Sequence, residues 1–329
     1  MKSALLDVLA CPKCKGSLVC NADGNLHHQE IMEGSLVCGD CCAEYPIVEG
    51  IPRFVGDGHY AGSFGYQWNI FRSEQIDSVN GTKLSTNRVF SETGWQSDSI
   101  RGKWILDAGC GAGRFLDVVA TTGAQVIGLD ISQAIDAAAK TVSGNPNVHF
   151  VQASIFEPPF KPGVLDAIYC IGVIQHTPDP VRAIKSLPKS LKGGGKLALT
   201  IYERRRFTLL NAKYLIRPLT KRLPKPVLLG LIRVSMPLLF LTTEMLFRIP
   251  VFGRLFTFLI PVANYVHEPS LSIRQRYQWA IMDTFDMLSP AFDSPQTQAE
   301  VEAALRACGM TDIKRLGNPG LNITATQSI

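Results

Sequence analysis

A glycine-rich turn between an apolar strand and a helix constrains the fold of this chain more than any other feature. Three glycines alternate with other residues directly after the apolar run at 104–108, and a helical pattern follows near 113–122: Gly109, Gly111 and Gly113. Glycine is needed where the backbone turns sharply and where a ligand must approach without a Cβ in its way. The turn therefore predicts a ligand site at the end of a strand, although a tight turn that binds nothing could use the same glycines.

Two acidic residues indicate what kind of ligand this turn suits. Asp107 lies two residues before Gly109, and Asp130 ends the next apolar run, seventeen residues beyond Gly113. A carboxylate in the place of Asp130 can accept hydrogen bonds from both ribose hydroxyls of an adenosine ligand. The Gly-x-Gly-x-Gly spacing differs from the dinucleotide fingerprint Gly-x-Gly-x-x-Gly. In addition, Asp107 would repel a pyrophosphate, but it suits a ligand that carries a sulfonium and an ammonium group.

Residues 102–202 resemble the class I S-adenosylmethionine-dependent methyltransferases, especially those similar to ubiquinone/menaquinone C-methyltransferases and small-molecule O-methyltransferases. The resemblance implies that S-adenosylmethionine binds at the glycine turn and at the acidic strand end that follows it. The residues that match the family motif are Asp107, Gly109, Gly111, Gly113 and Asp130. In that family an Asp after the third strand usually bonds the adenine amino group. Ser154 stands there in this chain, so adenine recognition is expected to rest on Ser154 and a backbone amide.

Alternation of apolar runs with helical patterns sets the expected fold class, which is α/β. Short apolar runs occupy 104–108, 125–129, 148–152, 165–171 and 196–202, with helical patterns near 113–122, 132–142 and 179–191. This alternation predicts a parallel sheet covered on both faces. A last helix near 296–308 and two short strands at 311–316 and 321–326 follow, with Asn318, Pro319 and Gly320 as a turn between them. The prediction is a doubly wound, seven-stranded, Rossmann-like methyltransferase sheet with an antiparallel hairpin at its edge.

His176 is the candidate catalytic base, because it lies in the segment after the fourth strand that resembles the family's passage beside the methyl donor. A histidine with a near-neutral pKa can take a proton from a hydroxyl or an activated carbon. Equally, His176 could bond only to the backbone, since methyl transfer needs mainly alignment and proximity. Tyr202 and Glu203 are further candidates on the same side. Aromatic residues at 64–68 could form a lid over the donor or an ordinary helix packed on the sheet.

Four of the nine cysteines form two Cys-x-x-Cys pairs that are separated by 23 residues: Cys11, Cys14, Cys38 and Cys41. Such pairs place four thiolates around Zn²⁺ and leave no open position, so the site is expected to be structural. The remaining cysteines, Cys42 included, lack pair spacing. The segment resembles the zinc-ribbon family that activates tRNA and protein methyltransferases, particularly at 45–47 and 50–52. An odd cysteine count and Asp7, where a signal peptide would be apolar, indicate a reducing, cytoplasmic location.

Residues 203–294 break the alternation and form an insertion that is expected to decide the acceptor. Nine basic residues and no acidic residue lie between Arg204 and Arg233, and apolar residues follow thickly. No uncharged run there reaches the roughly 18–20 residues of a membrane-spanning helix. The segment 204–260 is therefore a candidate for peripheral contact with the inner face of an anionic membrane or for enclosing a lipid-like acceptor. A buried helical cap with a solvated basic rim fits equally, and RNA binding fits the arginines but not the apolar density.

The sequence divides into a zinc ribbon at 1–55, lid or linker helices at 56–101, a core that binds S-adenosylmethionine at 102–202, a helical cap at 203–294 and a closing helix and hairpin at 295–329. We predict methyl transfer to a hydroxyl or carbon of a small-molecule or lipid-linked acceptor. The alternatives are an RNA base methyltransferase and a non-catalytic assembly partner. A polar and aromatic cluster at 274–286 is a candidate lining for the acceptor pocket.

Overall fold

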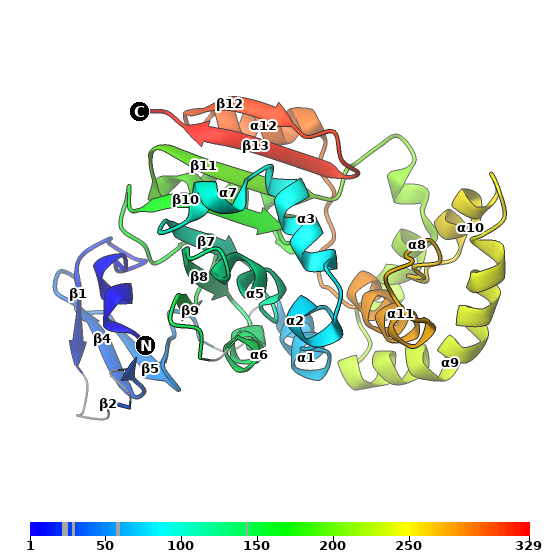
Figure 1. Cartoon of the computed structure of the whole chain (residues 1–329), viewed down its shortest axis with the longest axis horizontal. Helices are drawn as coiled ribbons and strands as arrows, with labels where there is room; N and C mark the ends of the chain where they lie inside the picture. The colour runs from blue at the N-terminus through cyan, green and yellow to red at the C-terminus, as the bar shows by residue number, and fades with distance from the viewer. Residues whose placement is uncertain (22–25, 28–29, 57–59, 143) are drawn as a thin grey trace.

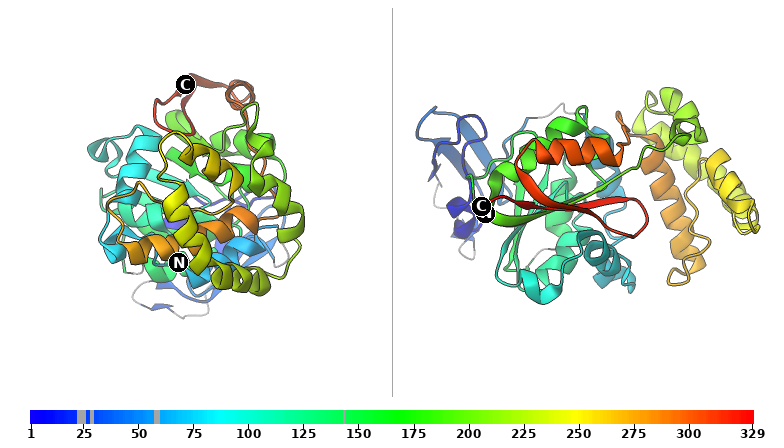
Figure 2. Two further views of the ribbon diagram at one scale, coloured as in Figure 1. Left: turned by 90° about the vertical axis from the view of Figure 1, so that its right-hand side faces the viewer. Right: turned by 90° about the horizontal axis from the view of Figure 1, so that it is seen from above.

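A computed structural model describes residues 1–21, 26–27, 30–56, 60–142 and 144–329 of the chain. Three parts follow one another along its long axis: a small N-terminal β domain, a central sheet with helices on both faces, and a helical cap at the opposite end (Figures 1 and 2). The N-terminal domain and the cap therefore reach opposite ends of the molecule.

The N-terminal domain is built on short antiparallel strands. It opens with the 3₁₀ helix η1 (Ser3–Asp7). A four-stranded sheet has the order β1-β4-β5-β6, and β2 pairs with β3. The strands are β1 (Leu18–Asn21), β2 (Leu26–His27), β3 (Glu30–Ile31), β4 (Gly34–Cys38), β5 (Glu44–Val48) and β6 (Ile51–Pro52). Four short helices then lead to the central sheet: α1 (Gly62–Ile70), α2 (Asp77–Asn80), α3 (Leu84–Thr93) and α4 (Ser97–Ile100).

The central sheet has seven strands in the order β12-β13-β11-β10-β7-β8-β9. Strands β7 to β11 run parallel to one another, whereas β13 is antiparallel to both β11 and β12. The bounds are β7 (Trp104–Ala108), β8 (Gln125–Asp130), β9 (Val148–Gln152), β10 (Leu165–Ile171), β11 (Leu191–Ile201), β12 (Met310–Arg315) and β13 (Leu321–Gln327). The predicted fold class and the hairpin at the sheet edge are thus confirmed.

Helices cover both faces of this sheet and bury its alternating side chains in two apolar clusters. One cluster collects side chains of α3, α5 (Arg114–Ala120) and α6 (Ala134–Thr141). The other collects side chains of α7 (Pro180–Ser186) and α12 (Gln298–Arg306), and it continues into the N-terminal domain through Leu5, Leu9 and Ile47. The 3₁₀ helices η2 (Ile174–His176) and η3 (Leu187–Ser190) flank α7. The N-terminal domain therefore shares its core with one face of the sheet.

The cap consists of η4 (Thr208–Leu210), α8 (Ala212–Thr220), α9 (Lys225–Leu246), α10 (Gly253–Leu259) and α11 (Ile273–Leu288). Its own apolar cluster joins α9 to α11 through residues such as Ile232, Met236 and Phe285. By length and composition alone, α9 could cross a membrane, and it is the one such helix among the described residues. In its most apolar 18-residue stretch, 33% is buried inside the protein. The chain has no uncharged run of that length, but α9 continues through Arg233 as one helix.

Candidate active site

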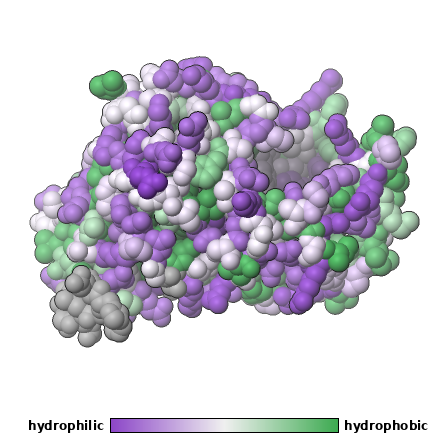
Figure 3. Space-filling view, viewed as in Figure 1, coloured by the Kyte–Doolittle hydropathy of each residue, from purple (hydrophilic) through white to green (hydrophobic). Residues whose placement is uncertain are grey.

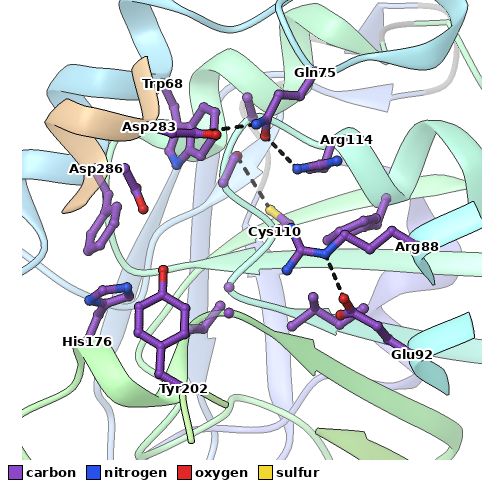
Figure 4. Close-up of a pocket in the computed structure, with 18 of the residues that line it drawn as sticks. Trp68, Gln75, Arg88, Glu92, Cys110, Arg114, His176, Tyr202, Asp283 and Asp286 are labelled. Atoms are coloured by element: carbon purple, nitrogen blue, oxygen red, sulfur yellow. Dashed lines mark hydrogen bonds and ion pairs between the residues drawn. The ribbon is translucent and has the colours of Figure 1, made fainter. Parts of the chain in front are cut away.

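A cavity of about 800 Å³ lies at the carboxyl ends of the central strands, between the sheet and the cap. The turns after β7, β8, β10 and β11 form its floor, α1 and α3 form one wall, and α11 closes it from the cap. Figure 4 shows side chains from α1, α3, α11 and the turns after β7, β10 and β11 pointing into one space. Ligands of open α/β sheets bind in this position, outside the carboxyl ends of the strands.

The glycine turn forms part of the cavity lining, and two of its glycines cannot be replaced without strain. Gly109 has a φ of 89°, and an added Cβ would lie 2.5 Å from a methyl carbon of Val173. Gly111 has a φ of 53°, and its Cβ would lie 3.0 Å from Nε1 of Trp68. Both positions therefore need glycine for backbone conformation and for close approach.

Asp130 lines the cavity at the end of β8, where the structure holds its carboxylate in place. The amide of Gly111 donates to Oδ2 of Asp130 at 3.0 Å. The amide and the hydroxyl of Ser132 donate to Oδ1 at 2.8 and 2.7 Å. These three donors fix the carboxylate where it borders the cavity. The structure thus brings Asp130 and Gly111 together, as the motif predicts.

Three of the residues predicted to hold the donor lie behind the cavity lining instead of in it. Asp107 is 2% exposed, and burial raises the pKa of its carboxyl to about 8. Gly113 faces Ala138 of α6, and Ser154 accepts a hydrogen bond from the amide of Phe156 at 3.2 Å. Ile131 and Ile155 line this end of the cavity in place of Ser154. Asp107 and Gly113 therefore support the turn from behind, and an apolar surface faces the end where an adenine would lie.

The aromatic segment in α1 contributes to the cavity and also packs as an ordinary helix. Phe64 and Trp68 line the cavity, whereas Gly65 packs against Ser132 and Gln133 next to α6. One face of α1 therefore lines the cavity and another packs on the core, and a lid over the donor stays a prediction.

His176 is 4% exposed and lines the same cavity (Figure 4). Nδ1 lies 3.1 Å from the carbonyl oxygen of Phe292, and since a carbonyl can only accept, Nδ1 carries the proton. Nε2 is buried and has no hydrogen-bond partner among the described residues. Burial lowers the pKa of His176 to about 4. The imidazole is therefore neutral at physiological pH, with a lone pair on Nε2.

Tyr202 and two aspartates of α11, Asp283 and Asp286, also line the cavity (Figure 4). Tyr265 donates a hydrogen bond to Oδ2 of Asp283, and Gln75 donates to Oδ1 at 3.4 Å. Burial, followed by the charge of Asp283, raises the pKa of Asp286 to about 7. Sequence reasoning placed these aspartates in a candidate lining but could not select them, because only the packing of α11 on the core reveals which helix face meets the cavity.

Two guanidinium groups also line the cavity, and Gln75 links one of them, Arg114, to Asp283 (Figure 4). Arg88 donates to Glu92 at 2.8 Å, and Arg114 donates to the side-chain oxygen of Gln75 at 2.6 Å. Sequence reasoning missed both residues. Arg114 directly follows the glycine motif, so its position at the first turn of α5 could have indicated it, whereas Arg88 lies outside the recognised segment.

The four paired cysteines converge in the N-terminal domain. Their sulfur atoms all lie within 4.8 Å of one another, and the Sγ–Sγ distances are 3.7 Å for Cys11 and Cys41 and 3.4 Å for Cys14 and Cys38. Tetrahedral Zn²⁺ with bonds of about 2.3 Å places its sulfur ligands nearly 4 Å apart, so the set fits the metal. The hydroxyl oxygen of Tyr45 lies 3.2 Å from Sγ of Cys11. Cys42 is exposed and outside the cluster, with a φ of 57° that glycine adopts readily.

The doubly wound sheet, the glycine turn and the carboxylate at the end of β8 define the central part as a class I S-adenosylmethionine-dependent methyltransferase domain. Residues 106–199 match the methyltransferase domain family. Residues 2–50 match the family described as Trm112p-like protein. The chain thus carries a Trm112-like domain with four clustered cysteines in front of a methyltransferase domain.

Curated relatives match part of the chain. A ubiquinone biosynthesis O-methyltransferase of Dechloromonas aromatica is 31% identical over 133 residues, which cover 38% of this chain and 57% of the relative. The enzyme of the same description from Coxiella burnetii is 32% identical over 132 residues, covering 38% and 56%. The chain therefore spans little more than half the length of these relatives.

Solved structures also match this chain, at low sequence identity and with TM-scores below 0.5. One is a complex of the Haloferax volcanii Trm112 methyltransferase activator with a methyltransferase, with a TM-score of 0.46, 12% identity, and coverage of 81% of this chain and 98% of that one. Human N-acetylserotonin methyltransferase with bound S-adenosylmethionine has a TM-score of 0.43, 15% identity, and coverage of 81% and 57%. At these TM-scores nothing about function follows from the likeness.

Proposed function

We propose that the chain transfers a methyl group from S-adenosylmethionine to a hydroxyl or carbon atom of a small-molecule or lipid-linked acceptor. One observation carries the proposal: a single cavity is lined both by Gly109, Gly111 and Asp130, where the donor is proposed to bind, and by His176, Tyr202 and Asp286, where the acceptor is proposed to bind. A donor and an acceptor held in one cavity would meet. Holding two reactants in this way replaces a bimolecular encounter and supplies much of the rate acceleration.

The donor end matches the groups of S-adenosylmethionine. Asp130 is placed to accept hydrogen bonds from the ribose hydroxyls, and Ile131 and Ile155 offer an apolar surface to the adenine. Arg88 and Arg114 are the cations that would face the amino-acid carboxylate. Trp68 lies against Gly111, so its ring would cover the bound nucleoside. When bound, the sulfonium supplies an electrophilic methyl group, and these residues hold it in line with the acceptor.

The acceptor end carries two groups that can receive a proton, the imidazole of His176 and the carboxylate of Asp286. In transfer to a hydroxyl, a bond forms between the acceptor oxygen and the methyl carbon as the carbon–sulfur bond breaks, and the bonding electron pair stays on sulfur. The hydroxyl proton then goes to Nε2 of His176 or to the carboxylate of Asp286. The O-methyltransferase activity named for the curated relatives supports transfer to oxygen.

The cysteine cluster is proposed to hold one structural Zn²⁺ through Cys11, Cys14, Cys38 and Cys41, because its sulfur spacing fits tetrahedral thiolate coordination. Four thiolates leave no position for a substrate, so the metal would stabilise the N-terminal domain and take no part in methyl transfer. Reduced, metal-bound cysteines fit a cytoplasmic protein.

Labelled donor incubated separately with lipid, small-molecule and RNA extracts tests the proposal. We expect label in the lipid or small-molecule fraction, and we expect it to be lost when Asp130 is replaced. Label only in RNA would establish an RNA methyltransferase instead. Donor that fails to bind, with no label in any fraction, would establish a non-catalytic assembly partner.

A further inference from the structure

The outward side of α9 presents a continuous row of apolar side chains to solvent. The row, called here the outer stripe, repeats at alternating intervals of four and three residues, which keeps its members on one helix face: Val227, Leu231, Val234, Leu238, Leu241 and Met245. Their exposed fractions lie between 49% and 83%. At 1.5 Å per residue the stripe is about 27 Å long. Contiguous apolar surface of this kind marks a site of interaction with a partner or a membrane.

Neighbouring parts of the cap extend the apolar surface beyond α9. Leu215 and Leu219 of α8 are 66% and 71% exposed, and Val251 and Phe252 before α10 are 88% and 60% exposed. The left-hand view of Figure 2 faces this end of the molecule, and Figure 3 shows apolar side chains gathered over the cap at its outer edge. The cap therefore carries further exposed apolar side chains besides the outer stripe.

The opposite side of α9 is fixed to the rest of the cap. Leu228, Ile232 and Met236 are at most 6% exposed and pack in one cluster with Phe285 of α11. Arg276 of α11 forms an ion pair with Glu244 of α9. A helix anchored in this way along one side cannot be surrounded by lipid, so α9 is suited to lying along a surface.

Charge separates the cap from the rest of the molecule. Residues 204–259 contain eleven of the 33 Lys and Arg residues and one acidic residue, Glu244, of the 28 in the chain. The segment thus carries a formal charge of +10, and the other 273 residues carry −5 within the total of +5. Lys221, Arg222, Arg233 and Arg254 are exposed. The charge around the apolar surface is therefore predominantly positive, and its one carboxylate, Glu244, is paired with Arg248 and Arg276.

We infer that this face of the cap docks on an anionic lipid bilayer, with the outer stripe among the headgroups and the basic residues against lipid phosphates. A bilayer meets both features at once, because it offers negative charge at its surface and hydrocarbon beneath it. A second copy of the chain would bring two faces of charge +10 together, and RNA would leave the apolar side chains without a partner. The inference rests on the proposed function for its purpose: Asp283 and Asp286 on α11, directly beneath α9, would meet an acceptor held by the membrane.

Cosedimentation of the full chain with vesicles tests this inference. Wild-type protein should pellet with vesicles that contain about one third phosphatidylglycerol in phosphatidylcholine at low salt, pellet far less at high salt, and stay in solution with phosphatidylcholine alone. The triple variant Val234→Asp, Leu238→Asp and Leu241→Asp should lose at least tenfold in bound fraction. Its matched control replaces Val19 and Val79, which are 58% and 62% exposed outside the cap, by Asp, and should bind as wild type.

A second variant tests the charges separately from the apolar stripe. Replacing Lys221, Arg222 and Arg254 by Gln should lower binding to the anionic vesicles at least tenfold, since each basic contact is worth roughly fivefold. The same replacement at Arg101, Lys103 and Lys314, which are exposed outside the cap, should leave vesicle binding unchanged. Circular dichroism and donor binding verify that each variant is folded.

Three results would overturn the inference. Wild-type protein could stay in solution with anionic vesicles at low salt, or the stripe variant could pellet as wild type does. Third, without vesicles, the wild-type protein could be a dimer and the stripe variant a monomer. The last result would assign the stripe to a second copy. Calorimetry with S-adenosylmethionine distinguishes a failure of the membrane-docking inference from a failure of the proposed function. Protein that binds the donor but no vesicles contradicts membrane docking alone, whereas protein that binds vesicles but no donor contradicts the methyltransferase proposal.

Discussion

At Gly111 the backbone is in the left-handed region, with a φ of 53°, and the indole of Trp68 lies where a side chain would begin. Replacing Gly111 by Ala should cost about 1–2 kcal/mol of stability through the backbone alone. It should also weaken donor binding at least tenfold, because the new methyl group pushes Trp68 away from the turn. Thermal denaturation and calorimetry with S-adenosylmethionine measure the two effects.

Gly230 provides the matched control for this substitution. It lies in the exposed part of α9 with no atom within 4 Å of an added Cβ. Replacing Gly230 by Ala should stabilise the protein by about 0.5–1 kcal/mol and leave donor binding unchanged. Equal donor affinity in the two variants would show that Gly111 does not border the donor.

The carboxyl of Asp286 should control how methyl transfer depends on pH. Its pKa is raised to about 7, and only the ionised form above that pH can accept a proton, so the rate should rise with pH around this value. His176 stays neutral through this range because its pKa is lowered to about 4. Asp286→Asn should give a lower rate without the step, and Asp312→Asn at an exposed position should retain it. A step that survives in Asp286→Asn would assign the titration to another group.

Individual residues differ in how far the sequence could predict their place. Gly111 and Asp130 follow from local spacing, because a strand, a turn and the next strand end fix their relation. Ser154 was predicted by analogy with an Asp of the family, and Ile131 and Ile155 line the cavity there instead. Asp286 and Arg88 reach the cavity from α11 and α3, and no local pattern encodes that long-range packing.

The stability of the N-terminal domain is expected to depend on the four clustered cysteines more than on any other set of side chains in it. Purified protein should contain one zinc per chain, and Cys38→Ser should lose it, since three thiolates hold the metal far more weakly. The loss of several kcal/mol should lower the melting temperature by on the order of 10 °C. Cys42→Ser, next to the cluster but outside it, should keep both the metal and the melting temperature. Metal retained in Cys38→Ser would contradict the proposed ligand set.

The parallel strands were the easiest elements to predict, because each is a short apolar run buried on both faces. Strand β11 begins at Leu191, five residues before the predicted start, since Gly193, Gly194 and Gly195 mask it in the sequence. Helix α9 was not resolved at the sequence level, because its apolar residues on the buried and exposed sides give no amphipathic pattern. Its role depends on which side packs against α11.

Over the whole molecule, one apolar cluster runs from the N-terminal domain into a face of the central sheet, through Leu9 and Ile47 on one side and Phe160 and Leu165 on the other. Arg53, just after β6, also donates to the side chain of Gln152 at 2.8 Å and to Asp136 at 2.7 Å. A shared core should unfold in one step. Calorimetry should therefore show a single transition for these two parts, and a separate early transition that zinc chelation abolishes would show that they fold independently.

The central claim is a site for S-adenosylmethionine at the ends of β7 and β8, and titration calorimetry of Asp130→Asn tests it most directly. The substitution removes a charge that Gly111 and Ser132 hold toward the cavity, and hydrogen bonds to charged groups contribute about 1.5–3 kcal/mol each. Wild-type protein should bind S-adenosylmethionine, Asp130→Asn should bind at least about tenfold more weakly, and Asp98→Asn, on a side chain that is 95% exposed, should bind as wild type. Folded wild-type protein that takes up no donor, or equal affinity in Asp130→Asn, would contradict the claim.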